Sequence, residues 1–325
     1  MKHPVWKLIY KFLLIGIPLY LLMLYTYFFP MNYMAIEYSM WAQQKEYSKS
    51  GNAANTLIIG DSRAKSGLMP TLLSEDTYNM AIGGTTSIEM YYALNRYLDH
   101  HTAPKNIMII FAPYHFCDID NWGQTQYFNY LTTPELLEVY QNALKFDDKV
   151  VLAGNPITDM ISYKLRLPNK YLSAQYNALF FGRRNDNLSK YQSVEKDLGY
   201  SAFGTDKGND GENYETHHEI FDQSLLVESY YYKLLQLCVD NDIRVFIEQS
   251  PVNQASYDLI SNDFFDGYHE FLSEVSATYP SISINSEVIA YDNQYFGDNN
   301  HLNPDGAKIF TDSIKKKYPE IFSSN

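Results

Sequence analysis

The chain has 325 residues, of which 46% are hydrophobic and 19% are charged. This composition is typical of a globular protein and excludes a disordered one, and the length allows one large domain or two small ones. The net charge of −13 disfavours nucleic acid and anionic lipid as partners. Aromatic residues make up 16%, led by 30 tyrosines. That excess suits a surface that meets sugars or a membrane interface, although biased base composition produces it as well.

The N-terminal segment has the pattern of a membrane anchor. It carries lysines at positions 2, 7 and 11 and no acid, and an uncharged run of 18 residues follows from Phe12 to Phe29. Such a run is long enough to cross a bilayer, and no Ala-x-Ala cleavage site comes after it. We therefore predict a single-pass transmembrane signal anchor over residues 1–30, with a cytoplasmic N-terminus and everything beyond it extracytoplasmic, in a bacterial cell envelope. The alternative is a buried helix of a soluble protein.

Residues 31–52 are predicted to be a juxtamembrane linker, helical at first and then a polar connection from Gln43 to Asn52. The remaining residues, 53–325, are predicted to form one domain. Apolar, β-prone runs predict five strands at Thr56–Ile59, Tyr78–Ile82, Asn106–Ala112, Arg244–Glu248 and Ser281–Asn285. Amphipathic patterns predict helices between and after them, at Ser66–Leu73, Thr86–Leu98, Leu225–Val239, Tyr257–Ser276 and Asn303–Lys317.

Strands that alternate with helices indicate an α/β fold with a parallel sheet. The alternation is interrupted between about residues 115 and 223, where helix and loop are mixed without a strand–helix unit. We interpret this stretch as an insertion that covers the site. In the closing helix, Asn303 is expected to be the N-cap and Pro304 to lie in the first turn.

The first chemical motif is Gly60-Asp61-Ser62, which follows directly on the first strand. It places a serine hydroxyl at the carboxyl end of a buried strand, where open α/β sheets build their sites. A serine needs a base to become a nucleophile, and the base needs its second nitrogen held. Asp298 and His301 meet that need, because a tight turn lets the carboxylate bind Nδ1 and leave Nε2 for Ser62. The Ser62 amide and Gly84 are candidate donors to an oxyanion.

These segments resemble the SGNH (GDSL-type) hydrolase superfamily. Gly60-Asp61-Ser62 matches its first block, Asn79 to Gly84 its second and Asp298 to Leu302 its last, over roughly residues 53–112 and 225–318. The resemblance implies a flavodoxin-like three-layer α/β/α fold, a triad of Ser62, Asp298 and His301, and an oxyanion role for Gly84. The third block normally reads Gly-x-Asn-Asp, whereas this chain has Ala112 to His115 there. Tyr114 or His115 could donate instead of the asparagine, or the donor is absent.

The layout is similar to that of membrane-anchored proteins of the same superfamily that work beside membrane-bound O-acyltransferases, as in D-alanyl transfer and alginate acetylation. This resemblance implies transfer of an acyl group, acetyl by preference, through an acyl-Ser62 intermediate to a cell-surface glycan or related polymer. The alternatives are a carbohydrate esterase that removes acetyl groups and a non-catalytic scaffold for a membrane-bound O-acyltransferase.

Each candidate residue also has a plainer interpretation. Ser62 could cap a helix, His301 could be a polar loop residue, Gly83-Gly84 a simple turn and Tyr114 a packing residue. Arg63 and Lys65 could receive an anionic substrate group, but solvated loop charges are the preferred interpretation.

No cofactor is expected, and no metal, because the histidine pairs 100–101 and 217–218 lack ligand spacing. Cys117 and Cys238 could form a disulfide or remain buried thiols.

Overall fold

A parallel β-sheet organises the region after residue 55 in the computed structural model, which describes residues 4–205 and 207–322. Its strands are β1 (Thr56–Gly60), β2 (Thr77–Asn79), β3 (Asn106–Ile110), β4 (Arg244–Ile247) and β6 (Ser283–Ile284). They are all parallel and follow the order β2-β1-β3-β4-β6. The prediction of an α/β fold with a five-stranded parallel sheet is therefore confirmed. A second, two-stranded parallel pair joins β5 (Val252–Asn253) to β7 (Ala290–Tyr291) and was not expected.

Alternate residues of the central strands pack into two separate apolar clusters. Leu57 and Ile59 belong to a cluster with residues of α5 (Ser87–Leu98), α11 (Leu225–Asp240) and α13 (Asn262–Thr278). Ile58 belongs to the other cluster, with residues of α3 (Ser62–Gly67) and α14 (Pro304–Lys317). The continuous apolar runs of the strands are explained by this arrangement, because side chains on both faces of a parallel sheet are removed from water.

The remaining elements of the domain are mostly short. They are α4 (Pro70–Leu73), η2 (Pro113–Phe116), α6 (Trp122–Tyr127), α7 (Thr133–Phe146), α8 (Pro156–Lys164), α9 (Pro168–Phe181), α10 (Arg183–Lys196), η3 (Tyr214–His217), α12 (Gln254–Tyr257), η4 (Asn293–Tyr295) and α15 (Pro319–Phe322). As predicted, no strand lies between η2 and η3 in the described residues of that stretch. Asn303 is the N-cap of α14, and its side chain accepts a hydrogen bond from the Gly306 amide at 3.0 Å.

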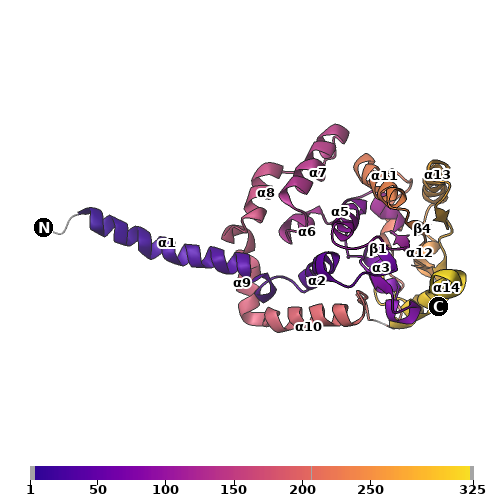
Figure 1. Ribbon diagram of the computed structural model, residues 1–325, viewed down its shortest axis with the longest axis horizontal. Coiled ribbons are helices and arrows are strands. Elements are labelled where there is room, and N and C mark those ends of the chain that lie inside the picture. Colours follow the sequence, from indigo (N-terminus) through magenta and orange to yellow (C-terminus); the bar gives the residue numbers. More distant parts are fainter. Residues whose placement is uncertain (1–3, 206, 323–325) are drawn as a thin grey trace.

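The N-terminal helix α1 (Pro4–Phe28) projects away from the domain (Figure 1). Residues Val5–Phe28 are long and apolar enough to span a membrane, and their most apolar 18-residue window is not buried in the structure, whereas Thr26 near the end of the helix is buried. After a single turn of 3₁₀ helix, η1 (Pro30–Asn32), the chain enters α2 (Glu37–Ser50). The segment from Gln43 that we predicted to be a polar linker is instead helical, since α2 continues to Ser50. Gln43, Gln44 and Tyr47 are buried, and the ring of Tyr47 stacks on that of Tyr78.

Gly60 offers a test of the sheet edge. It ends β1 with φ +148°, and a β-carbon built on it would lie 1.7 Å from the Ile110 carbonyl oxygen. Because the clash adds to backbone strain, Gly60→Ala is expected to lower the free energy of unfolding by about 3 kcal/mol. Thermal unfolding of the detergent-solubilised full-length chain measures the loss.

Gly123→Ala is the matched control. Gly123 lies in α6, and nothing described lies within 4 Å of its β-carbon position. Alanine favours a helix over glycine by up to about 1 kcal/mol, so this variant should be at least as stable as the parent. Equal melting temperatures for the two variants would contradict the account of Gly60.

Candidate functional site

The site lies at the carboxyl edge of the sheet, where β1 ends and α3 begins. The chain leaves Gly60, places Asp61 at the N-cap of α3 and puts Ser62 in the first helical position. The Asp61 carboxylate accepts the Arg63 amide at 2.8 Å, so the capping group is Asp61 and not Ser62. The interpretation of Ser62 as a helix cap is therefore wrong. Asp61 leaves Ser62 without a capping role, and Ser62 lines a cavity of about 520 Å³.

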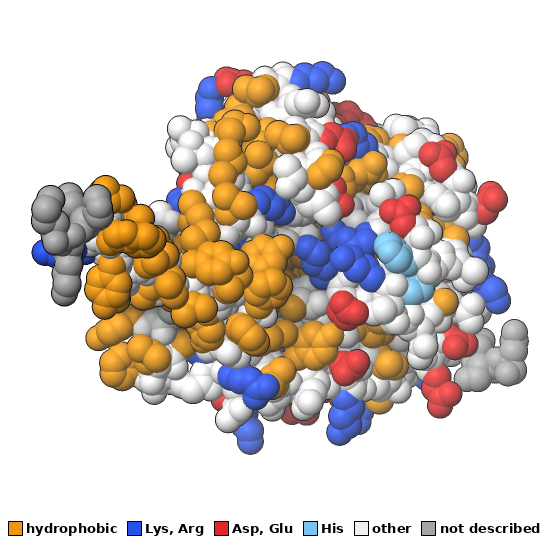
Figure 2. Space-filling model, turned by 60° about the vertical axis from the view of Figure 1, so that its left-hand side comes forward, with side chains coloured by type: hydrophobic (Ala, Val, Ile, Leu, Met, Phe, Trp, Pro, Cys, Tyr) orange, Lys and Arg blue, Asp and Glu red, His pale blue; other side chains and the backbone are white. Residues whose placement is uncertain are grey.

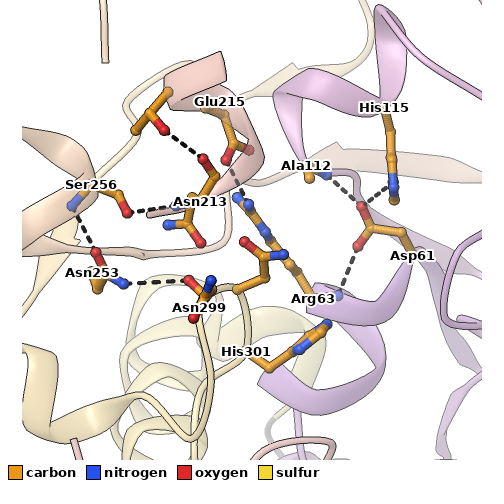
Figure 3. A network of polar contacts seen from close by, with 12 residues as sticks. Asp61, Arg63, Ala112, His115, Asn213, Glu215, Asn253, Ser256, Asn299 and His301 are labelled. Carbon is orange, nitrogen blue, oxygen red and sulfur yellow. Dashed lines mark hydrogen bonds and ion pairs between the residues drawn. The ribbon is translucent and has the colours of Figure 1, made fainter. Parts of the chain in front are cut away.

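Asp61 also fixes the end of β3. Its Oδ2 accepts the Ala112 amide at 2.6 Å and lies 2.7 Å from Nδ1 of His115 (Figure 3). Burial alone would raise the pKa of Asp61, but the His115 ring, the Ala112 amide and the Arg63 charge outweigh it and hold the pKa below its usual value. The carboxylate is therefore charged at neutral pH and joins the ends of two strands and the start of α3.

His301 reaches the same cavity from the opposite end of the chain. Its Nδ1 lies 2.8 Å from both carboxylate oxygens of Asp298, while Oδ1 of Asp298 also accepts the backbone amides of Asn300 and His301 at 2.9 and 2.8 Å. Burial tends to raise the pKa of Asp298, but these hydrogen bonds and the His301 charge leave it lowered. The tight turn predicted from Asp298 to His301 is thus held by the aspartate that orients the imidazole.

Nε2 of His301 is buried and has no hydrogen-bond partner among the described residues. Ser62 and His301 both line the cavity, although no hydrogen bond between them is formed there. Catalytic hydrogen bonds are often longer in a site without substrate and shorten when substrate binds. The ring of Phe203 packs on that of His301 with centroids 4.8 Å apart and restricts its rotation.

The second glycine motif runs beside Ser62. Asn79 donates to the carbonyls of Ala64 and Leu68 at 2.8 and 3.2 Å, which ties the end of β2 to α3. Gly83 and Gly84 then line the cavity. Gly84 has φ +74°, and a β-carbon built on it would lie 2.6 Å from Nδ2 of Asn121. The glycine is required both by its conformation and by the closeness of this amide.

The predicted oxyanion residues differ in position. Tyr114 lines the cavity, and burial raises the pKa of its hydroxyl far above the usual value, so that it remains a possible donor. His115 is only 2% exposed and is not part of the cavity wall. Its ring nitrogens face Asp61 at 2.7 Å and Asp120 at 3.9 Å, which leaves it well placed to support Asp61.

Several cavity residues were not found from the sequence. They are Glu37, Met40, Trp41, Asp120, Asn121, Gln124, Phe203, Tyr214 and Asn300. Trp41 comes from the stretch predicted as a linker, and Asn121 precedes α6 in the insertion. We predicted that the insertion at 115–223 covers the site. Only short segments of it, around Asp120, Phe203 and Tyr214, line the cavity, whereas α7, α8 and α9 do not.

Arg63 and Lys65 are not solvated loop charges, so that interpretation was wrong. Arg63 is buried and extends to Glu215 of η3, with 2.6 Å between the charged groups (Figure 3). Close to Arg63 and Glu215, the Asn253 side chain donates to the backbone carbonyls of Gly211 and Asn299 at 2.9 and 3.3 Å (Figure 3). Lys65 is fully buried, and burial lowers its pKa to about 7. It does not line the cavity.

Cys117 and Cys238 are free thiols, the first half-buried and the second buried. A scan against models of known protein families finds no match for this chain, and a search of curated proteins finds no significantly similar sequence.

The Asp61 contacts give a prediction about stability. Asp61→Asn should lower the free energy of unfolding at pH 7 by about 3–5 kcal/mol, because it breaks a buried, charged network. The lowered pKa of Asp61 means that its contribution is complete above the pKa of an unfolded aspartate, about 3.9, and is lost as the pH falls toward the folded pKa. The difference between the two proteins should therefore narrow below about pH 4.

Denaturant unfolding of the detergent-solubilised chain over a range of pH measures this effect. Asp266→Asn is the control, since Asp266 is exposed on α13. If Asp61→Asn lowers the free energy of unfolding no more than Asp266→Asn does, the stabilising role assigned to the Asp61 contacts is contradicted.

Proposed function

We propose that this protein is a membrane-anchored, serine-dependent O-acyltransferase of the SGNH type. The observation that carries the proposal is the cavity itself, which is lined by Ser62 and by a histidine whose Nδ1 is held by Asp298 and whose Nε2 has no partner among the described residues. The strand order and the two apolar clusters on opposite faces support a flavodoxin-like three-layer α/β/α architecture. The N-terminal helix supports an anchored protein, whose domain we place outside the cytoplasm because lysines precede the span.

In the first half-reaction, His301 Nε2 takes the Ser62 proton while Oγ attacks the carbonyl carbon of an acyl donor. The tetrahedral intermediate collapses, the bond to the leaving group breaks, and the protonated imidazole returns the proton to that group. In the second half-reaction, Nε2 takes the proton of an acceptor hydroxyl, which attacks the acyl-Ser62 ester. The new ester leaves, and Ser62 recovers its proton from His301. Asp298 orients the imidazole in both steps.

The oxyanion needs donors, and Asn121 is the strongest addition to the predicted set. Its amide lies against Gly84, and both residues line the cavity with Ser62. We propose that the Asn121 side chain supplies the donor that the third sequence block lacks, together with the backbone amides of Ser62 and Gly84. Tyr114 is the second candidate. A membrane-bound O-acyltransferase as the source of the acyl group and a cell-surface glycan as the acceptor remain the partners that the resemblance implies.

Ser62→Ala should abolish acylation of the protein. The full-length chain is incubated with an aryl acetate, and the acetylated serine is located by mass spectrometry. Ser66→Ala is the matched control, because this buried hydroxyl lies one turn along α3 and bonds, among the described residues, to the Ser62 carbonyl at 2.9 Å. Asp298→Asn should lower the acylation rate by about 10⁴ through the wrong imidazole tautomer.

The fate of the acetyl group separates the remaining functions. Rapid release of acetate without an acceptor would favour the esterase, whereas acetylated sugar or polyol would favour transfer. If cells whose only copy of this protein carries Ser62→Ala show unchanged acylation of the cell surface, both enzymatic functions are excluded and the non-catalytic scaffold is favoured.

The oxyanion assignment is tested by Asn121→Ala and Tyr114→Phe. Loss of one donor costs about 10² to 10³ in rate, so Asn121→Ala should slow acylation by that amount. Tyr114→Phe removes the hydroxyl alone and should cost less than tenfold. The acylation rates are compared at saturating acyl donor. A larger loss in Tyr114→Phe than in Asn121→Ala would assign the oxyanion donor to Tyr114.

A further inference from the structure

We propose that the outer face of α8 and α9 lies in the interface of an anionic phospholipid bilayer, beside the anchor helix. The α8–α9 face is defined by the exposed side chains of Ile157, Ile161, Leu172, Tyr176, Leu179 and Phe180. Leu179 is 82% exposed and Phe180 is 66% exposed, which is unusual for such side chains in water. The inference rests on the membrane anchorage in the proposed function, and it adds a second attachment.

The spacing on α9 separates two faces of one helix. Leu172, Tyr176, Leu179 and Phe180 follow the i, i+4, i+7, i+8 pattern of a single stripe. Tyr171, on another side of the helix, is fully buried in the domain, where its hydroxyl donates to the Tyr127 carbonyl at 2.9 Å. The helix is therefore fixed to the domain by one face while its apolar stripe remains without a described partner.

The base of α1 is joined directly to α9. Gln175 donates to the Thr26 hydroxyl at 2.6 Å, and the Tyr33 hydroxyl donates to the Thr26 carbonyl at 2.6 Å. The rings of Tyr33 and Tyr171 are also in edge contact, with centroids 5.8 Å apart. These contacts involve buried or partly buried groups, so they hold the end of the span against the domain at a fixed place.

The α8–α9 face is on the side of the domain from which α1 emerges (Figure 1). Figure 2 shows a broad group of hydrophobic side chains that runs from α1 onto this side of the domain, with some polar and basic side chains among them. If α1 spans a bilayer, the surface of that bilayer meets this side. The apolar face would then enter the region of headgroups and acyl chains, as interfacial amphipathic helices do.

The charge of the segment favours anionic headgroups. Residues 156–184 contain five basic residues and one acidic residue, but Arg166 is buried and Lys164 bonds to the Leu131 carbonyl, so neither of these two charges is counted toward the surface. The single acid, Asp159, is paired with Lys170 at 2.6 Å, while Arg184 is exposed at the start of α10. Basic groups next to a membrane surface attract acidic lipids. The net negative charge of the whole chain therefore does not prevent the α8–α9 face from binding an anionic lipid surface.

The test places a fluorescent bimane label at single cysteines of the full-length chain in vesicles of phosphatidylcholine and phosphatidylglycerol with brominated acyl chains. The background is Cys117→Ala, since Cys238 is buried. Labels are placed by Leu179→Cys on α9, Leu13→Cys in α1 and Leu259→Cys just after α12. Leu259 is 57% exposed and belongs to the end of the domain far from α1 (Figure 1).

We expect the brominated lipid to quench the labels at positions 13 and 179 at least threefold more than the label at 259. Quenching at 13 with none at 179 would overturn the inference and leave the anchor in place. Absence of quenching at 13 would overturn the anchorage and this inference together. No other protein is present in the vesicles, so a face that binds a protein partner instead would also give no quenching at 179.

The lipid charge is tested separately. Arg183→Gln with Arg184→Gln should reduce quenching at position 179 about twofold in vesicles that contain phosphatidylglycerol. The same pair should have little effect in phosphatidylcholine alone. Equal quenching in both lipids, with and without the arginines, would show that the face binds a bilayer without selecting anionic headgroups.

Discussion

The buried carboxylate of Asp61 is the interaction on which the site depends. One side chain accepts the Arg63 amide in the first turn of α3, accepts the Ala112 amide after β3, and faces the imidazole of His115. A charge can be buried in this way only when hydrogen bonds replace its water, and here two amides and a ring do so. The position of Ser62 follows from this, since it is the next residue in the chain and begins the helix that Asp61 caps.

The site is assembled from segments that are far apart in the chain but end at one edge of the sheet. The loop that holds Asn121 follows β3 and η2, the turn that holds His301 follows η4, and both line one cavity with Ser62 at the carboxyl end of β1. The helix α2 adds Glu37, Met40 and Trp41 to the cavity wall. The segment next to α1 therefore forms part of the cavity wall, and the position of α1 and the shape of the cavity are connected through a single helix.

Local pattern predicted much of the fold because each element carries its own signal. The run from Ile107 to Ile110 is apolar throughout and forms most of the expected buried strand β3. β2 ends at Asn79 and is shorter than predicted, since the Asn79 side chain accepts the Ala81 amide and donates to carbonyls of α3 and its C-cap, although the amides of Met80 and Ile82 still bond to carbonyls of β1. Asp298 and His301 were identifiable because both members of the pair lie within one turn. Arg63 was misjudged since its partner, Glu215, is 152 residues away.

The sequence by itself determined the five parallel strands, the apolar N-terminal helix and the Asp298–His301 turn, because each depends on residues that are neighbours in the chain. Only the tertiary structure decided that Asn121 lies against Gly84, that Trp41 lines the cavity and that Lys65 is buried. It also decided that α9 lies beside the end of α1. These relations depend on how distant segments pack, and no periodicity or spacing along the chain records them.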